Sequence, residues 1–440
     1  MRDMTRGSIP KHIIAYVIPM ILGNLLQLTY NAADSVIISK FLGENSLAAV
    51  ATAGPVMTLM ILGASGIGIG AGVLMSRFYG SRDTQKLKKE FAMTLLMGAI
   101  LECVVFALGF PFAKAILRLI KTPESVLNEA ALYLRVILVG FLFSFQYNVL
   151  SHSMRALGET KRPVYYLSAS CILNIGLDYL LVGVMGAGVA GAAAATAVSQ
   201  ALSMVLCVFG IKKRIPLLSV KREDFTPDKA LLKETASNGL LTALQQAAQP
   251  VGKLLIQSTV NSLGTSAMAA FNAVSRVDDF ACIPAQSLGS GIMTATAQNR
   301  GAGDEKRTMD SIKKGLLLAL CWFPIICSAI LLFKKPVIAL LTPDDAEVCR
   351  AMALSHLSVK AWLYFLPCIT NAIQGYFRGR GKMTTVLIAT CTQISIRALL
   401  VVLFMPKYGI VVEAWAAAVG WVAMIAYEGV LMALKKDGRK

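Results

Sequence analysis

The sequence predicts an all-α integral membrane protein with twelve transmembrane helices in two pseudo-symmetric six-helix bundles. Three observations support this: apolar segments long enough to cross a bilayer, positive charge in every second loop, and weak similarity between the two halves of the chain. Of the 440 residues, 56% are hydrophobic and 15% are charged. A soluble domain has roughly a quarter charged residues, so the composition is that of a chain surrounded by lipid.

The apolar segments come first, because a run of about 20 apolar residues crosses the hydrocarbon core of a bilayer. The first run is too long for a signal peptide and lacks a small-residue cleavage site, so we interpret it as a retained helix. The twelve expected helices lie near residues 12–33, 47–73, 91–112, 130–153, 164–183, 188–210, 235–259, 266–293, 314–333, 352–375, 384–404 and 411–434.

Positive charge marks every second loop. If the first helix begins inside the cell, the expected cytoplasmic segments hold 30 of the 43 Lys and Arg residues. This is the positive-inside pattern, so the net charge of +18 indicates orientation and not a nucleic-acid partner. We expect a multi-pass protein of the inner (plasma) membrane with both termini cytoplasmic. The cytoplasmic segments would be 1–11, 77–90, 154–163, 211–233, 299–314, 376–383 and 435–440.

Cysteine and histidine usage excludes several classes of site. The nine cysteines include no C-x-x-C pair, and the three histidines are His12, His152 and His356. Neither a disulfide framework nor a zinc site is indicated. We expect no cofactor, apart from a coupling ion.

The two halves of the chain are similar at fixed offsets. We therefore predict an N-terminal bundle at 1–210, a cytoplasmic linker at 211–233 and a C-terminal bundle at 234–440. Parallel repeats of this kind are a known layout of secondary transporters. The matching pairs are Gly43 and Gly264, Gly80 and Gly301, and Asp83 and Asp304 at offset 221, then Asn148 and Asn371, Arg155 and Arg378, Gly158 and Gly381, and Gly186 and Gly409 at offset 223.

Polar residues within the expected spans of the N-terminal half are candidates for ion binding. A charge at bilayer depth costs about 2.5–3.5 kcal/mol, so Asp34 and Asp178 need a functional reason. Carboxylates lined by amide and hydroxyl oxygens suit a proton or Na⁺. The first helix also carries Asn24, Gln27 and Asn31 on the face of Asp34; interhelical hydrogen bonding is the alternative for Asn24 and Gln27. The other polar residues of this half are Tyr133, Asn148, Asn174 and Thr196.

The C-terminal half has no acids at the corresponding positions: Leu255 replaces Asp34, and Val401 replaces Asp178. Its seventh helix carries a polar stripe with one cation. The candidate cavity or substrate residues of this half are Gln245, Gln249, Lys253, Asn371 and Gln374. Arg276, Asp278 and Asp279 either line the cavity or form a buried ion pair. Lys360 either pairs or reaches the interface, and Glu413 and Glu428 are expected near the interface.

Several segments, in order and spacing, resemble the multidrug and toxic compound extrusion (MATE) transporters over nearly the whole chain. The segments are Asn31-Ala-Ala-Asp34, Phe41-Leu-Gly43, Leu47-Ala-Ala, Arg155-Ala-Leu-Gly158 with Pro163, Leu173-Asn-Ile-Gly-Leu-Asp178, Gly188-Val-Ala-Gly-Ala-Ala and Gln298-Asn-Arg-Gly-Ala-Gly303.

The resemblance implies a V-shaped fold and antiport of organic cations against H⁺ or Na⁺. It implies an ion site in the N-terminal half, with Na⁺ at Asp34, Asp178 and Asn174 if sodium is the ion, and a helix bend at Pro19. The acids that some sodium-coupled members have on helices 7 and 10 are missing, because Gln245, Gln246, Asn371 and Gln374 stand there. The implied ion-coupling residues are Asp34, Tyr133, Asn148, Asn174, Asp178 and Thr196.

We therefore expect a secondary active antiporter, not an enzyme, that exports small organic compounds and uses H⁺ in preference to Na⁺. Asn24, Gln27 and Asn31 would join the C-terminal residues named above in the substrate cavity. We expect a monomer in the lipid bilayer. The alternative is a flippase of lipid-linked precursors, which would need a strongly cationic cavity; Lys253, Arg276 and Arg397 keep it open.

Overall fold

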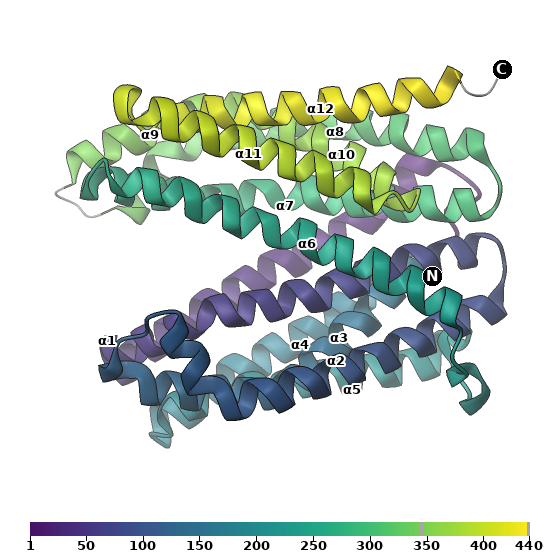
Figure 1. The fold of residues 1–440 in the computed structure, drawn as a ribbon, viewed down its shortest axis with the longest axis horizontal. Coiled ribbons are helices and arrows are strands. Elements are labelled where there is room, and N and C mark those ends of the chain that lie inside the picture. Colours follow the sequence, from purple (N-terminus) through teal and green to yellow (C-terminus); the bar gives the residue numbers. More distant parts are fainter. Residues whose placement is uncertain (343–345, 438–440) are drawn as a thin grey trace. The chain divides into compact units, whose positions relative to one another are not determined.

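The structure is a computed structural model and describes residues 1–342 and 346–437. The end of the expected cytoplasmic segment 435–440 lies outside the described residues. The regular structure in the described part is helical throughout (Figure 1). The helices are α1 (Ile9–Gly80), α2 (Thr84–Leu119), α3 (Glu124–Ala156), α4 (Lys161–Asp178), η1 (Tyr179–Val184), α5 (Gly188–Arg214), η2 (Pro216–Leu218), η3 (Arg222–Phe225), α6 (Lys229–Asn261), α7 (Thr265–Gly301), α8 (Glu305–Leu341), α9 (Glu347–Leu363), α10 (Phe365–Gly379), α11 (Met383–Tyr408) and α12 (Val412–Asp437).

All twelve predicted segments are helical over nearly their whole length, and most of the helices extend beyond the predicted ends. Two findings differ from the prediction. The segment 352–375 is not one straight helix, because α9 and α10 meet at Tyr364 with a bend of 47°. Among the described residues, nine helices are apolar enough to cross a membrane, or ten if the bent pair is one span, and neither α6 nor α7 is among them. Polar and charged residues, such as Lys253 in α6 and Asp279 in α7, interrupt the apolar sequence of these two helices.

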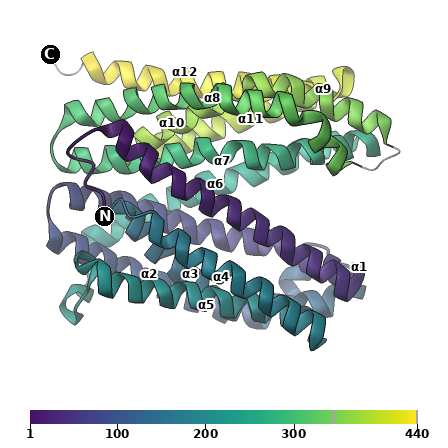
Figure 2. The ribbon, with the colours of Figure 1, turned by 180° about the vertical axis from the view of Figure 1, so that it is seen from behind.

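The described residues form two compact units. Unit 1 comprises Met1–Asp3 and Ile18–Ala243, and unit 2 comprises Met4–Val17 and Leu244–Lys440. Within unit 1, α3 contacts both α2 and α5, and α5 contacts α4. Within unit 2, α7 contacts α8, α9 and α10, and α11 lies along α12 (Figure 2).

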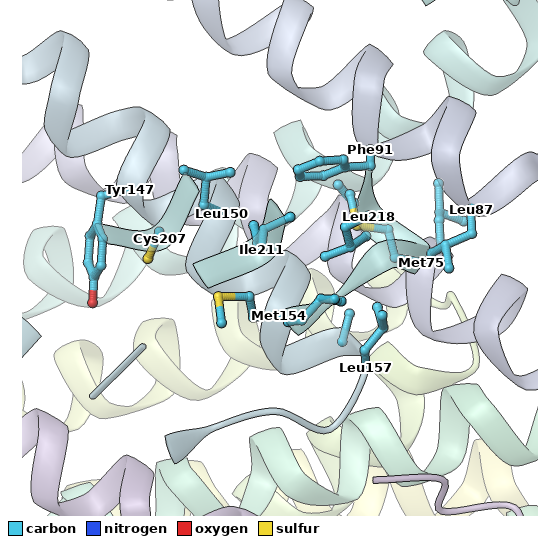
Figure 3. Close-up of a cluster of buried hydrophobic side chains, with 14 of the residues drawn as sticks. Met75, Leu87, Phe91, Tyr147, Leu150, Met154, Leu157, Cys207, Ile211 and Leu218 are labelled. Carbon is cyan, nitrogen blue, oxygen red and sulfur yellow. The ribbon is translucent and has the colours of Figure 1, made fainter. Parts of the chain in front are cut away.

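A cluster of apolar side chains forms the core at one end of unit 1 (Figure 3). Leu218 of η2 belongs to this cluster, so the segment predicted as a linker packs against unit 1. The start of α6 is held nearby: Asp228 accepts the Leu231 N–H at 3.1 Å and pairs with Lys89 at 3.3 Å. The Leu231 N–H and the Lys89 ammonium both lower the pKa of Asp228. The labelled members of the cluster are Met75, Leu87, Phe91, Tyr147, Leu150, Met154, Leu157, Cys207, Ile211 and Leu218.

The internal repeat reappears in the backbone. Gly43, which separates the two spans of α1, has φ 81° and ψ −176°, and its partner Gly264 has φ 96° and ψ 174°. The next helices begin alike: Asp83 accepts the Lys86 N–H at 3.0 Å, and Asp304 accepts the Arg307 N–H at 2.8 Å. Matching glycine pairs also share positive φ, with 75° and 71° at Gly158 and Gly381 and 63° and 78° at Gly186 and Gly409. Equivalent positions in the two halves therefore make the same turns.

We expect Gly43→Ala to destabilise the protein by about 1–3 kcal/mol, because a β-carbon disfavours this dihedral region. Gly63→Ala is the matched control: an added β-carbon meets nothing within 4 Å at either position, but Gly63 lies in helical backbone. Alanine there should stabilise α1 by about 0.5–1 kcal/mol. Thermal unfolding of the detergent-solubilised protein measures both changes, and equal midpoints for the two variants would contradict the assigned strain.

Candidate ion-coupling site

The centre of the candidate site is a pair of aspartates in unit 1. Asp178 is the last residue of α4, where the chain continues into the π-helical turn η1, and its side chain is fully buried. Asp34 lies on α1 and is half-buried. The two carboxyl groups are within hydrogen-bonding distance of each other. Irregular π-helical turns occur often at functional sites, and this one places Asp178 opposite Asp34.

Three of the four carboxyl oxygens of this pair lack a hydrogen-bond donor within the described part of the chain. Oδ1 of Asp34 and both carboxyl oxygens of Asp178 are buried and have no hydrogen-bond partner among the described residues. Two facing carboxylates repel each other when both are ionised, and a buried polar atom without a partner costs free energy. A proton shared by the two groups, or a small cation between them, would remove both penalties.

Two tyrosines surround the aspartates. The hydroxyl groups of Tyr30 and Tyr133 lie within electrostatic reach of both carboxylates. Tyr133 is buried on α3, and Tyr30 lies one helical turn before Asp34 on α1. Elements α1, α3 and α4 therefore each bring a polar group to the same region.

A small pocket lies beside the pair. Both side-chain polar atoms of Asn174 are buried without a partner among the described residues, as is Oε1 of Gln200. Such oxygens suit a hard cation. The described residues contain no group of three or more His, Cys, Asp or Glu side chains that could hold a metal, so Na⁺ would depend on amide and hydroxyl oxygens as well. The pocket is lined by Tyr30, Leu167, Ser170, Cys171, Asn174, Thr196, Ser199 and Gln200.

The remaining predicted residues of unit 1 lie elsewhere or are otherwise engaged. Asn148 donates to the Ser144 carbonyl of its own helix at 2.8 Å. Gln27 and Asn31 are exposed, and Asn24 is half-buried. Within α1 the backbone leaves helical dihedral angles at Gly43 and not at Pro19, although the division between the two units falls close to Pro19, between Val17 and Ile18.

Two of the predicted cavity residues of unit 2 form a buried polar cluster. Nε2 of Gln245 and Nε2 of Gln374 both donate to the Thr390 hydroxyl, at 3.1 and 3.0 Å. Arg378 donates to Oε1 of Gln245 at 2.7 Å. These three helices, α6, α10 and α11, are thereby tied together inside the unit. Asn371 donates to the Pro367 carbonyl of its own helix at 2.8 Å.

A network of buried charges in unit 2 was not predicted as a whole. Glu413, which was expected near the membrane interface, is fully buried. Its Oε2 atom lies 2.6 Å from Nε2 of His356 and 3.1 Å from Nζ of Lys360, and its Oε1 atom accepts from Arg397. Lys360 also pairs with Asp278, which accepts from Tyr364 at the α9–α10 bend. Lys360 and Asp278 are therefore internal partners.

The repeat relates this network to the site in unit 1. At the offset of 223 residues, His356 corresponds to Tyr133 and Arg397 to Asn174. In unit 1, Asp34 and Asp178 form no ion pair with a cation among the described residues. In unit 2, Lys360 pairs with Asp278 and Glu413, and Arg397 pairs with Glu413. The charges of Asp278, Glu413, Lys360 and Arg397 balance one another without a bound ion.

Sequence reasoning missed Tyr30 and Gln200 in the pocket. A usable signal was present for both, because Tyr30 precedes Asp34 by one helical turn and Gln200 follows Thr196 by one turn. The charge network had no such signal: its members lie on four helices, α7, α9, α11 and α12, and at the α9–α10 bend, and their pairing depends on tertiary packing.

We expect Glu413→Gln to lower the free energy of unfolding by about 3–5 kcal/mol, because it leaves buried cations without their counter-ion. Glu124→Gln is the matched control. Glu124 pairs with Arg118 at 3.0 Å, but both side chains are exposed, and such pairs contribute about 1 kcal/mol or less. Thermal unfolding in detergent measures both. A small effect of Glu413→Gln, similar to that of the control, would show that the network does not stabilise unit 2.

Comparison with known proteins agrees in sequence and in fold. The MatE family model matches residues 19–180 and again residues 242–403, once in each half. "Probable multidrug resistance protein YpnP" of Bacillus subtilis is 29% identical over 387 residues, which are 88% of this chain and 86% of the relative. "Probable multidrug resistance protein NorM" of Thermotoga maritima is 26% identical over 421 residues, with 91% and 86% covered.

Solved structures share the fold. A structure described as the outward-facing conformation of a multidrug resistance MATE family transporter has a TM-score of 0.92 at 24% identity, with 100% of this chain and 98% of that chain covered. A MOP superfamily transporter from Pyrococcus furiosus, described as having a binding pocket of reverse polarity, has a TM-score of 0.90 at 24% identity, with 97% and 96% covered.

Both halves of the chain match one family model, and together the matched residues make up more than half of its length. The chain is thus a multi-pass membrane protein of a transporter family and not an enzyme: it belongs to the MatE family, the multidrug and toxic compound extrusion transporters.

Proposed function

We propose that this protein is a secondary active antiporter that exports organic, drug-like cations in exchange for an ion bound between Asp34 and Asp178. The observation that carries the proposal is the pair of facing carboxyl groups, three of whose four oxygens have no donor among the described residues. The printed names of the relatives, which describe multidrug resistance proteins, support the export of varied compounds.

The proposed coupling ion is H⁺. One proton satisfies both carboxyl groups through a single hydrogen bond and removes one of the two negative charges. Na⁺ is the alternative, and it would recruit Asn174 and Thr196 from the pocket wall. We propose that unit 2 binds no coupling ion at its equivalent positions, because Lys360 and Arg397 already neutralise Asp278 and Glu413.

Exchange requires that the outward- and inward-facing states differ in their affinity for ion and substrate. We propose that protonation of the aspartate pair favours the state that releases the organic cation outside. Return of the protein to the inward-facing state then releases the proton inside. The proton gradient thus supplies the free energy for export. We propose that both termini are cytoplasmic and that the functional unit is a monomer in the cell membrane.

The flippase alternative loses support from the internal pairing. Arg397 pairs with Glu413, and Arg378 is held by Gln245. Of the three cations that kept this alternative open, Arg397 is thus occupied by an internal partner, whereas Lys253 and Arg276 are exposed.

We expect Asp34→Asn and Asp178→Asn each to reduce ion-driven efflux by about 5- to 150-fold. This range corresponds to a typical coupling free energy of about 1–3 kcal/mol. Each substitution removes one of the two carboxyl groups that share the ion. The measurement is dye efflux from proteoliposomes under an imposed pH or Na⁺ gradient, with substrate-dependent ion flux recorded in parallel. Asp310→Asn, at a surface acid 4.0 Å from Lys314, is the control and should retain wild-type rates.

Wild-type efflux in both variants would overturn the assignment of the ion site. The gradient that drives the wild-type protein identifies the ion: transport driven by a Na⁺ gradient at equal pH on both sides would replace H⁺ with Na⁺. Size-exclusion profiles equal to those of the wild type establish that the variants are folded.

A further inference from the structure

Three charged side chains of unit 2 are exposed on neighbouring helices. Lys253 of α6 lies 4.0 Å from Asp279 of α7, and these side chains are 50% and 58% exposed. Arg276, one turn before Asp279, is also exposed. The two helices are joined by a short turn and pack through an apolar cluster that contains Ile256 and Phe271. The three charges therefore share one surface, although the sequence left their role open.

The exposed polar residues follow the helical period. Beyond its first residue, the exposed polar residues of α7 are Asn272, Arg276, Asp279 and Gln286, spaced by 4, 3 and 7 residues, which places them on one face. On α6, Gln249 and Lys253 are four residues apart and both exposed. We call these six residues the α6–α7 polar face.

The depth of this face argues that it meets water and not lipid. Asp279 lies about 21 Å from the end of α7 that adjoins α6, and Lys253 lies about 12 Å from the end of α6, at 1.5 Å per residue. The ammonium group that pairs with Asp279 thus reaches inward, away from the headgroups. An aspartate is too short to reach the headgroups, and a charge that faces hydrocarbon costs about 2.5–3.5 kcal/mol.

The face carries one more positive than negative charge. Asp278, the neighbouring acid, is turned into the buried network and is neutralised there by Lys360. Asp279 offsets one cation, and its contact with Lys253 is long. Arg276 forms no ion pair within the described part of the chain. An exposed guanidinium that meets water is a ready partner for a carboxylate, which it can bind through two parallel hydrogen bonds.

We propose that the α6–α7 polar face binds an anionic group of the exported compound, and that the preferred substrates are amphoteric molecules with both a basic nitrogen and a carboxylate. This inference rests on the proposed export function. Arg276 and Lys253 hold the carboxylate, and Asp279 weakens that binding by competing for Lys253. A compound that has the basic nitrogen but no carboxylate is transported without the contact to Arg276 and Lys253.

The test compares two dyes that differ in one group: a zwitterionic rhodamine with a free benzoate, and its methyl ester. Purified full-length protein is reconstituted in neutral phosphatidylcholine vesicles, and initial rates of gradient-driven transport are measured for both. We expect Arg276→Gln and Lys253→Gln each to lower the rate ratio of acid to ester by about tenfold, the effect of losing one charge-assisted hydrogen bond. Asp279→Asn should raise the same ratio.

Lys314→Gln is the control, since Lys314 is an exposed lysine in unit 2 that pairs with Asp310 at i,i+4, and it should leave the ratio unchanged. An unchanged rate for the ester in each variant shows that the protein still folds and transports. If the ester rate falls instead, Arg276→Lys, which keeps the charge and loses the planar fork, replaces Arg276→Gln in the comparison.

The outcomes separate the two proposals. If the wild type transports neither dye under any gradient, the proposed export function is overturned, and this inference falls with it. If both dyes are transported and Arg276→Gln and Lys253→Gln leave the ratio unchanged, the inference alone is overturned. If the variants change the rates of both dyes equally, and only in vesicles that contain an anionic lipid, the face binds a lipid headgroup and the substrate assignment is wrong.

Discussion

The cost of keeping charge out of water is the constraint on which this structure depends. Each ionisable group within the spans must pair with an opposite charge, bind an ion or face water. The two units meet this requirement differently. Unit 2 pairs Glu413 and Asp278 with Lys360 and Arg397. Unit 1 leaves Asp34 and Asp178 facing each other, and three of their four carboxyl oxygens have no donor among the described residues.

This difference arises within a shared framework. Gly43 and Gly264 adopt the same left-handed dihedral angles at the ends of equivalent helices, and Asp83 and Asp304 cap the helices that follow. The turns of the two halves thus have the same backbone conformation, while the charged side chains inside the two halves differ. Glycine at such positions is a condition of the backbone geometry, whereas an interior charge can change whenever its partner changes with it.

The pairing within unit 2 also limits which of its charges can act on a transported molecule. Asp278 and Asp279 are adjacent in sequence but belong to different environments. Asp278 points to Lys360 and Tyr364 inside the unit, and Asp279 is exposed beside Lys253. Because neighbouring residues on a helix lie about 100° apart around its axis, one acid serves the packing of the unit and the other remains at the surface.

The sequence by itself determined the class of fold, since apolar length and alternating loop charge reflect the bilayer directly. It also determined the internal repeat and the acids at Asp34 and Asp178, because a carboxylate within an apolar run stands out without any knowledge of packing. Helix ends were predicted less well: α2 extends over Thr84–Leu119, whereas the apolar run covers 91–112, because the polar turns of a helix have no hydrophobic signal.

Only the tertiary structure decided which polar groups meet. It brought Tyr30 and Gln200 into the pocket with Asn174, and it turned Asn148 to its own helix. It buried Glu413 among cations from α9 and α11 and bent the chain at Tyr364. The reason is that pairing between helices depends on how each helix is rotated and tilted against its neighbours, and residue spacing along one helix carries no information about the face that the next helix presents.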